Sequence, residues 1–173
     1  IFVSYPSLYE PHIYLEDKVK IEFSVRSIKE PFEIVQIQSI LSEYFPQLPY
    51  QEIPFEVSAA SSHKTFIEKM CLMHEKIKIK EIIQHHDMER QSRHLYDMAQ
   101  MKDSGIFGKA LKDRMLYAII VEHRKNWIRL KSIDYEQLQS KTIAFVPTED
   151  LMDFFRDDYA QMREIMIYGD VPS

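Results

Sequence analysis

The fold is decided by "KTFIEKMCLMHE" at residues 64–75 and "RHLYDMAQM" at residues 93–101, which predict two helices joined by a polar connection. In the first helix one apolar stripe recurs at helical spacing and must be buried. Its members are Phe66, Met70, Met73 and Ile77. Lys69 lies at the edge of this stripe, where a lysine points across a cleft rather than into bulk water. We therefore expect a packed helix with one cation at the margin of its core face.

The second helix carries Arg93 and Asp97 at i and i+4, on the side away from Leu95 and Met98. Two interpretations are open. The pair can be an ordinary surface ion pair worth about 0.3–0.5 kcal/mol, with Lys69 extending to solvent from a packed stem. Alternatively, the two helices offer a cation and a carboxylate to one site. The spacing by itself favours the first interpretation.

Composition sets further bounds. A chain of 173 residues with 45% hydrophobic residues can bury a real core. A net charge of −5 argues against a generally basic, nucleic-acid-binding surface, although it does not exclude a local basic cleft. The single cysteine, Cys71, can form no intrachain disulfide and is typical of a reducing cytoplasm. There is neither a signal-like segment nor a long apolar run, so we expect a cytoplasmic protein without a membrane span.

A strand is expected at "KVKIEFSVRS", residues 18–27, where apolar and polar residues alternate. Its polar face would present Lys20, Glu22 and Arg26 side by side. That face can be a solvated sheet surface stabilised by opposite charges. It can also hold a carboxylate rigidly on a central strand, where Glu22 would bind a divalent metal or orient an attacking hydroxyl.

Further elements complete an α+β fold. We expect strands over 33–38 and 54–60, a long helix from about Lys109 to about Trp127, and a last helix capped by Thr148. The long helix is expected to bury Leu111, Met115, Ala118 and Ile119. Residues 1–60 would form a partial sheet lobe and residues 61–173 a helical C-terminal lobe. His85, His86 and Asp87 lack the spacing of a helical zinc pair, and Asp157 and Asp158 are interpreted as solvated surface residues.

Four motifs in the same order resemble the nucleotidyltransferase-like AbiEii/AbiGii toxin family. They are "VKIEFSVRS", "KTFIEKMCLMHE", "RHLYDMAQM" and the tail "DYAQMREIMIYGDVPS", and together they span nearly the whole chain. The resemblance implies a nucleotidyltransferase-like sheet joined to a helical part. It also implies a toxin of a bacterial toxin–antitoxin or phage-abortive system, with a cognate antitoxin as partner.

The resemblance further implies transfer of a nucleotide from Mg²⁺-NTP to an acceptor such as RNA, notably tRNA. Lys20 and Glu22 match the strand motif that supplies a further carboxylate to the metal site, so Glu22 would be a metal ligand. Lys69 matches the lysine that contacts the triphosphate. Arg93 and Asp97 match the motif whose aspartate the family requires for activity. A cation that clamps developing charge beside aligned carboxylates suits phosphoryl transfer.

The family's first signature, a "GS" turn followed by "DxD", is absent from these residues, and the only glycines are Gly105, Gly108 and Gly169. That signature holds the metals and the phosphates. We therefore expect this chain to be inactive alone, as the later part of an enzyme whose Mg²⁺ depends on the missing motif. The alternative is a catalytically silent module that binds an antitoxin or RNA. A weaker third interpretation is a metal-dependent nuclease using Glu22 with Asp97.

Overall fold

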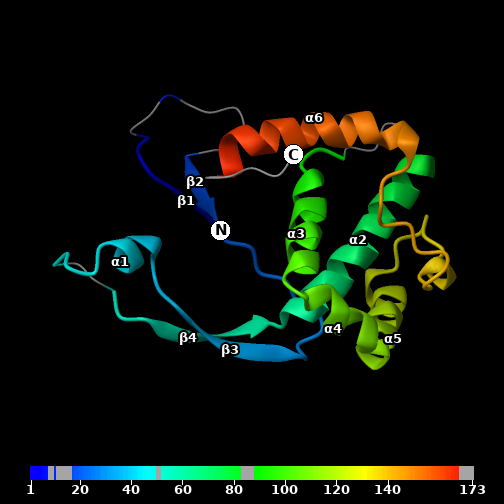
Figure 1. The fold of residues 1–173 in the computed structure, drawn as a ribbon, viewed down its shortest axis with the longest axis horizontal. Helices are drawn as coiled ribbons and strands as arrows, with labels where there is room; N and C mark the ends of the chain where they lie inside the picture. The colour runs from blue at the N-terminus through cyan, green and yellow to red at the C-terminus, as the bar shows by residue number, and fades with distance from the viewer. Residues whose placement is uncertain (8–9, 11–16, 50–51, 83–87, 168–173) are drawn as a thin grey trace.

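The computed structural model describes residues 1–7, 10, 17–49, 52–82 and 88–167. Strands occur only before residue 61 in this part of the chain, and the residues after it are helical or irregular (Figure 1). The predicted α+β class is confirmed. The division into two lobes near residue 60 stays a prediction. His85, His86, Asp87 and the end of the tail motif, residues 168–173, lie outside the described residues.

The β-structure consists of two separate antiparallel ribbons. In the first, β1 (Phe2–Ser4) pairs with β2 (Lys18–Lys20). In the second, β3 (Phe32–Ile37) pairs with β4 (Phe55–Ala60) over their full length. The short helix α1 (Ile40–Tyr44) connects these two strands, and the ribbon extends away from the helices with α1 at its far end (Figure 1). The predicted strands at 33–38 and 54–60 are thus confirmed, but they pair with each other rather than with the first ribbon.

The strand predicted over residues 18–27 is wrong beyond Lys20. Ile21 still donates its backbone N–H to Ile1 at 2.8 Å, and after it no described strand lies alongside to continue the ladder. The residues that follow have no regular structure, and Phe23 and Val25 are 80% and 99% exposed. A strand needs a hydrogen-bonded neighbour to persist, so an alternating pattern is not sufficient. Glu22 consequently lies on irregular, exposed chain and not on a central strand.

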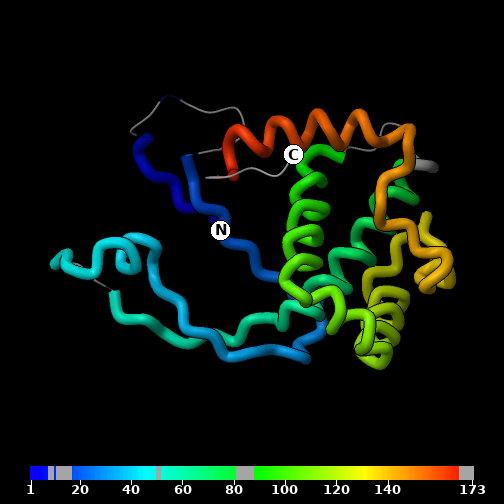
Figure 2. The backbone as a smooth tube through the Cα atoms, in the orientation of Figure 1, coloured from blue at the N-terminus to red at the C-terminus, as the bar shows by residue number. Residues whose placement is uncertain are grey.

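Helix α2 (Ser62–Ile82) is the centre of the helical part (Figure 2). Its predicted stripe is confirmed, because Phe66, Met70, Met73 and Ile77 are all at most 8% exposed. Cys71 is also buried, and burial raises the pKa of its thiol to about 12. The other helices are α3 (Ser92–Asp103), α4 (Ile106–Lys112), α5 (Arg114–His123), the π-helical turn η1 (Arg124–Ile128), the 3₁₀ turn η2 (Tyr135–Gln137) and α6 (Glu149–Met166). No helix among the described residues has the length and apolarity to cross a membrane.

The prediction of one long helix from Lys109 to Trp127 is wrong in two ways. The helix is not continuous, and the residues that it buries are not the expected ones. The chain breaks at Asp113, whose carboxylate accepts the backbone N–H of Leu116 at 2.9 Å and so starts α5 as an N-cap. The break changes the rotational register between α4 and α5. The buried residues are therefore Ala110, Leu116 and Ile120, and the four residues expected in the core are exposed. Those four are Leu111, Met115, Ala118 and Ile119.

Asp158 ties α6 to the beginning of α3. Its carboxylate accepts the backbone N–H groups of Arg90 and Ser92, each at 2.7 Å, and its side chain is buried with the residue 7% exposed. Gln91 precedes the first residue of α3 and provides no side-chain cap, so Asp158 satisfies these helix-start donors from another helix. The interpretation of Asp158 as a solvated residue is wrong, whereas its neighbour Asp157 is exposed as expected.

We predict that Asp158→Ala lowers the free energy of unfolding by about 2–4 kcal/mol, because the buried N–H of Ser92 and the part-buried N–H of Arg90 lose a charged acceptor. Asp157→Ala removes the same group from the next, exposed position, and it should change stability by no more than about 0.5 kcal/mol. Urea unfolding followed by circular dichroism measures both. Equal effects of the two substitutions would contradict the assigned role of Asp158.

Candidate functional site

The site is built where the middle of α2 meets α3. The Nζ atom of Lys69 lies 2.8 Å from Oδ2 of Asp97 and 3.3 Å from Nδ1 of His94. The side chain of Lys69 is 20% exposed and that of Asp97 is 44% exposed, so the ion pair lies at the edge of the core. The structure thus brings together two residues that are 28 positions apart in the sequence. The predicted cation at the margin of the stripe has a carboxylate partner on the neighbouring helix.

His94 is the second partner of Lys69. Burial lowers the pKa of its imidazole to about 4, and the positive charges of Lys69 and Arg93 act in the same direction. The ring is therefore neutral near pH 7. Because an ammonium group only donates hydrogen bonds, Nδ1 of His94 must accept, and the proton of the neutral ring is on Nε2. Two of the three ammonium hydrogens are directed at Asp97 and His94, and the third has no partner among the residues that the structure describes.

A cavity of about 350 Å³ opens beside Lys69. Its walls come from the segment between β2 and β3, from α2 and α3, and from the end of α5 with η1. The lining residues are Ser24, Arg26, Ser27, Ile28, Thr65, Glu68, Lys69, Leu72, His94, Ile120, His123, Arg124 and Ile128. Arg26 forms no ion pair with any residue that the structure describes. Arg26 therefore gives the cavity wall a cation that no described carboxylate pairs with, and this cation attracts an anion.

Polar contacts from α2 hold the walls of the cavity. Glu68 accepts a hydrogen bond from the hydroxyl of Ser27 at 2.7 Å, and Lys64 donates to the carbonyl oxygen of Ile28. On the other wall, Arg124 forms a bidentate pair with Glu75, which is 2% exposed, at 2.7 and 2.5 Å. The charge of Arg124 is thus compensated within the protein. Among the other cations of the lining, Lys69 is paired with the half-exposed Asp97, whereas Arg26 forms no ion pair with a described residue.

The remaining predicted residues do not join this site. Arg93 is exposed on α3, and Asp97 pairs with Lys69 instead of with Arg93, so the predicted i, i+4 pair is not formed. Lys20 and Glu22 form an exposed ion pair of their own, at 2.7 Å. The hydrogen bond from Lys20 lowers the pKa of Glu22, and the charge of Arg93 contributes a smaller effect in the same direction. Neither Lys20 nor Glu22 lines the cavity.

The described residues show no ready-made group of metal ligands. They contain no cluster of three or more His, Cys, Asp or Glu side chains placed to hold a metal ion. Mg²⁺ prefers octahedral oxygen ligands, and Glu22 offers a single carboxylate that already pairs with Lys20. To hold Mg²⁺, Glu22 would need further oxygen ligands beside its own carboxylate.

Sequence reasoning missed the contribution of His94 and of the cavity walls. His94 and Asp97 are three positions apart on α3, so they share a face, and this spacing was the available signal. The roles of Arg26 and Arg124 had no such signal, because each depends on a contact between segments far apart in the chain.

We predict that His94 makes the stability of the protein depend on pH. The unfolded imidazole is protonated near its ordinary pKa of 6.5 and the folded one near 4, so the unfolded chain binds more protons between these values. The stability that the neutral ring contributes is complete above pH 6.5 and is lost as the pH falls toward 4. Unfolding of wild type and His94→Asn from pH 8 to 4 measures this. The difference between the two proteins should change in that window, and parallel curves would contradict the assignment.

Comparison with protein families identifies the chain. A family model described as "Nucleotidyl transferase AbiEii toxin, Type IV TA system" matches residues 1–172. Neither the curated proteins nor the solved structures gave a match. The family match covers nearly the whole sequence, including the Lys69–Asp97 pair and the tail that supplies Asp158. The chain therefore belongs to the AbiEii family of nucleotidyl transferase toxins of type IV toxin–antitoxin systems.

Proposed function

We propose that the chain takes part in transferring a nucleotide from an NTP to an acceptor, with RNA and in particular tRNA as the acceptor class. The observation that carries this proposal is the Lys69 ammonium held between Asp97 and His94 at the edge of an anion-attracting cavity. A triphosphate carries several negative charges, and a fixed cation stabilises the charge that develops on it during transfer.

In this proposal Lys69 binds the triphosphate, and Asp97 keeps the ammonium in place or orients the acceptor. Arg26 provides a second cation across the cavity. Arg93 and Lys20 do not line the cavity, and in this proposal they assist by attracting the nucleotide or the acceptor. Glu22 is the one carboxylate of the strand motif, and it supports a metal site only together with further oxygen ligands.

The chain lacks the "GS…DxD" signature, so we propose that residues 1–173 are inactive by themselves and that Mg²⁺ acts only together with that signature. Because the family is placed in type IV toxin–antitoxin systems, we further propose a cognate antitoxin that counteracts the activity. Transfer to RNA would take place in the cytoplasm. The competing function is a catalytically silent module that binds antitoxin or RNA.

We predict that transfer of label from α-labelled NTPs to total RNA by the complete gene product falls about a hundredfold or more in Lys69→Ala and in Asp97→Ala. Each of the four NTPs is tested separately, with RNA and protein as acceptors. Lys102→Ala and Asp103→Ala remove the same kinds of charge from exposed positions of α3, and both should keep wild-type activity.

Circular dichroism and the unfolding midpoint show whether each variant is folded. Loss of transfer in folded Lys69→Ala and Asp97→Ala, with both controls active, supports the proposal and identifies the nucleotide. A folded, full-length wild type that labels no acceptor contradicts the enzymatic function and favours the silent module. Shortening of RNA with Mg²⁺ and without NTP would instead indicate a nuclease.

A further inference from the structure

A second, larger cavity is bounded by α2, α4, α5 and the segment after η2. It measures about 750 Å³ and shares no lining residue with the cavity beside Lys69. Its lining is mainly aliphatic and aromatic. The lining residues are Phe66, Ile67, Met70, Phe107, Ala110, Leu111, Arg114, Tyr117, Leu138, Gln139, Ser140, Ile143 and Phe145. The floor is the protein core, since Ile67 and Leu138 are at most 2% exposed.

The walls of this cavity are tied together by contacts between its own lining residues. Phe66 on α2 and Phe107 on α4 pack edge to face, with their ring centroids 5.4 Å apart. The hydroxyl of Tyr117 on α5 donates to the carbonyl oxygen of Leu138 at 3.1 Å. A preformed, mainly apolar cavity of this size falls in the range of about 300–1,000 Å³ that small-molecule sites occupy. The cavity therefore has the size and the lining of a ligand site.

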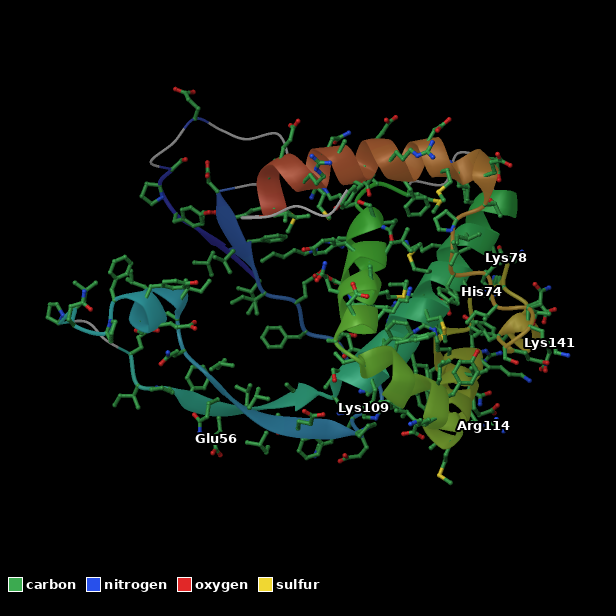
Figure 3. The ribbon with its side chains drawn as sticks, in the orientation of Figure 1. Glu56, His74, Lys78, Lys109, Arg114 and Lys141 are labelled. Atoms are coloured by element: carbon green, nitrogen blue, oxygen red, sulfur yellow. The ribbon has the colours of Figure 1, made fainter. Side chains whose placement is uncertain are left out.

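The charge of the lining is positive. Among the described residues that line the cavity, Arg114 is the only one with a charged side chain, and none is Asp or Glu. Burial raises the pKa of Tyr117 to about 12, so its hydroxyl adds no negative charge near pH 7. Arg114 is exposed and forms no ion pair with a residue in the described part of the chain. Figure 3 shows it between Lys109 and Lys141, which are exposed as well.

We propose that this cavity binds a small amphipathic anion, a molecule with an apolar body and one carboxylate group. The apolar body fills the space between the aromatic rings, and the carboxylate pairs with Arg114 at the exposed rim. A guanidinium group can give a carboxylate two parallel hydrogen bonds. Gln139 and Ser140 are exposed lining residues whose side chains offer further donors. Binding here is separate from the proposed nucleotidyl transfer, because the two cavities share no residue.

The lining favours this ligand over other small molecules. A nucleotide would place several phosphate charges and a polar base against apolar walls with a single cation. A cationic molecule would be repelled by Arg114 and would meet no carboxylate among the described lining residues. A neutral apolar molecule would fit the walls but would gain nothing from the guanidinium group.

Octanoate and octan-1-ol test the two parts of the site separately, because they share one chain and differ in charge. Isothermal titration calorimetry of the full chain at neutral pH measures both affinities. We expect octanoate to bind more tightly than octyltrimethylammonium. Its affinity should rise about threefold for each methylene group added from hexanoate to decanoate, as expected for an apolar body that becomes buried.

Arg114→Gln should lower the affinity for octanoate about tenfold and leave the affinity for octan-1-ol unchanged, because it removes only the charged partner. Ala110→Leu should weaken the binding of both ligands alike, because the larger side chain takes up cavity volume. Lys112→Gln is the matched control. It removes an exposed cation two positions from Arg114 that does not line the cavity, and it should bind both ligands as wild type does.

The proposal is overturned if octanoate does not bind, if octyltrimethylammonium binds as tightly, or if Arg114→Gln and Lys112→Gln have equal effects. It is also overturned if wild type sediments as a dimer that Leu111→Lys dissociates, since a second copy then covers the cavity. Leu111 lines the cavity and is 61% exposed. Circular dichroism shows whether each variant is folded. If Ala110→Leu misfolds, the comparison of Arg114→Gln with Lys112→Gln still decides, because both of these residues are exposed.

Discussion

The structure depends on the burial of a helix that carries charges. Helix α2 lies in the core on most of its surface, so each of its polar side chains needs a partner within the protein. Each partner lies in a different segment. Glu68 accepts a hydrogen bond from Ser27, Lys69 pairs with Asp97 on α3, and Glu75 pairs with Arg124. His74, which is fully buried, accepts the backbone N–H of Ala144 at 2.9 Å. The contacts that satisfy α2 are therefore also the contacts that assemble the fold around it.

The candidate site follows from the same constraint. Burial of the apolar stripe of α2 fixes the position of Lys69. Helix α3 is fixed by the hydrogen bond from Ser92 to Asp158 and by the ion pair between Asp97 and Lys69. The ammonium is thereby fixed at the edge of a cavity instead of extending freely into solvent. On another side of α2 lies a second cavity of about 750 Å³, whose lining is mainly aliphatic and aromatic. One helix thus separates two surfaces with different chemistry.

The local periodicity of α2 predicted its buried stripe. The start of α6 after Thr148 was also predicted, with its acidic first turn, but the side chain of Thr148 makes no capping hydrogen bond. Failures arose where a distant contact decides the outcome. Residues 21–27 alternate like a strand, but pairing is a property of two segments. Asp113 was read as an interior helix residue, although an aspartate is a good N-cap and can restart a helix. Asp158 looked solvated because its two donors lie about 66 to 68 residues earlier in the chain. The spacing of residues within each helix likewise did not predict that Lys69 pairs with Asp97, because the two residues lie on different helices.

The most direct test of this account is a double-mutant cycle between Lys69→Met and Asp97→Asn, with the free energy of unfolding as the measured quantity. A structure organised by the polar contacts of α2 predicts a coupling of at least about 0.5 kcal/mol, because the two residues touch. The same Lys69→Met substitution combined with Asp157→Asn should be additive, since Asp157 is exposed on α6 and makes no hydrogen bond or ion pair with the described residues of α2. Additivity of Lys69→Met and Asp97→Asn to within about 0.3 kcal/mol would contradict the central claim.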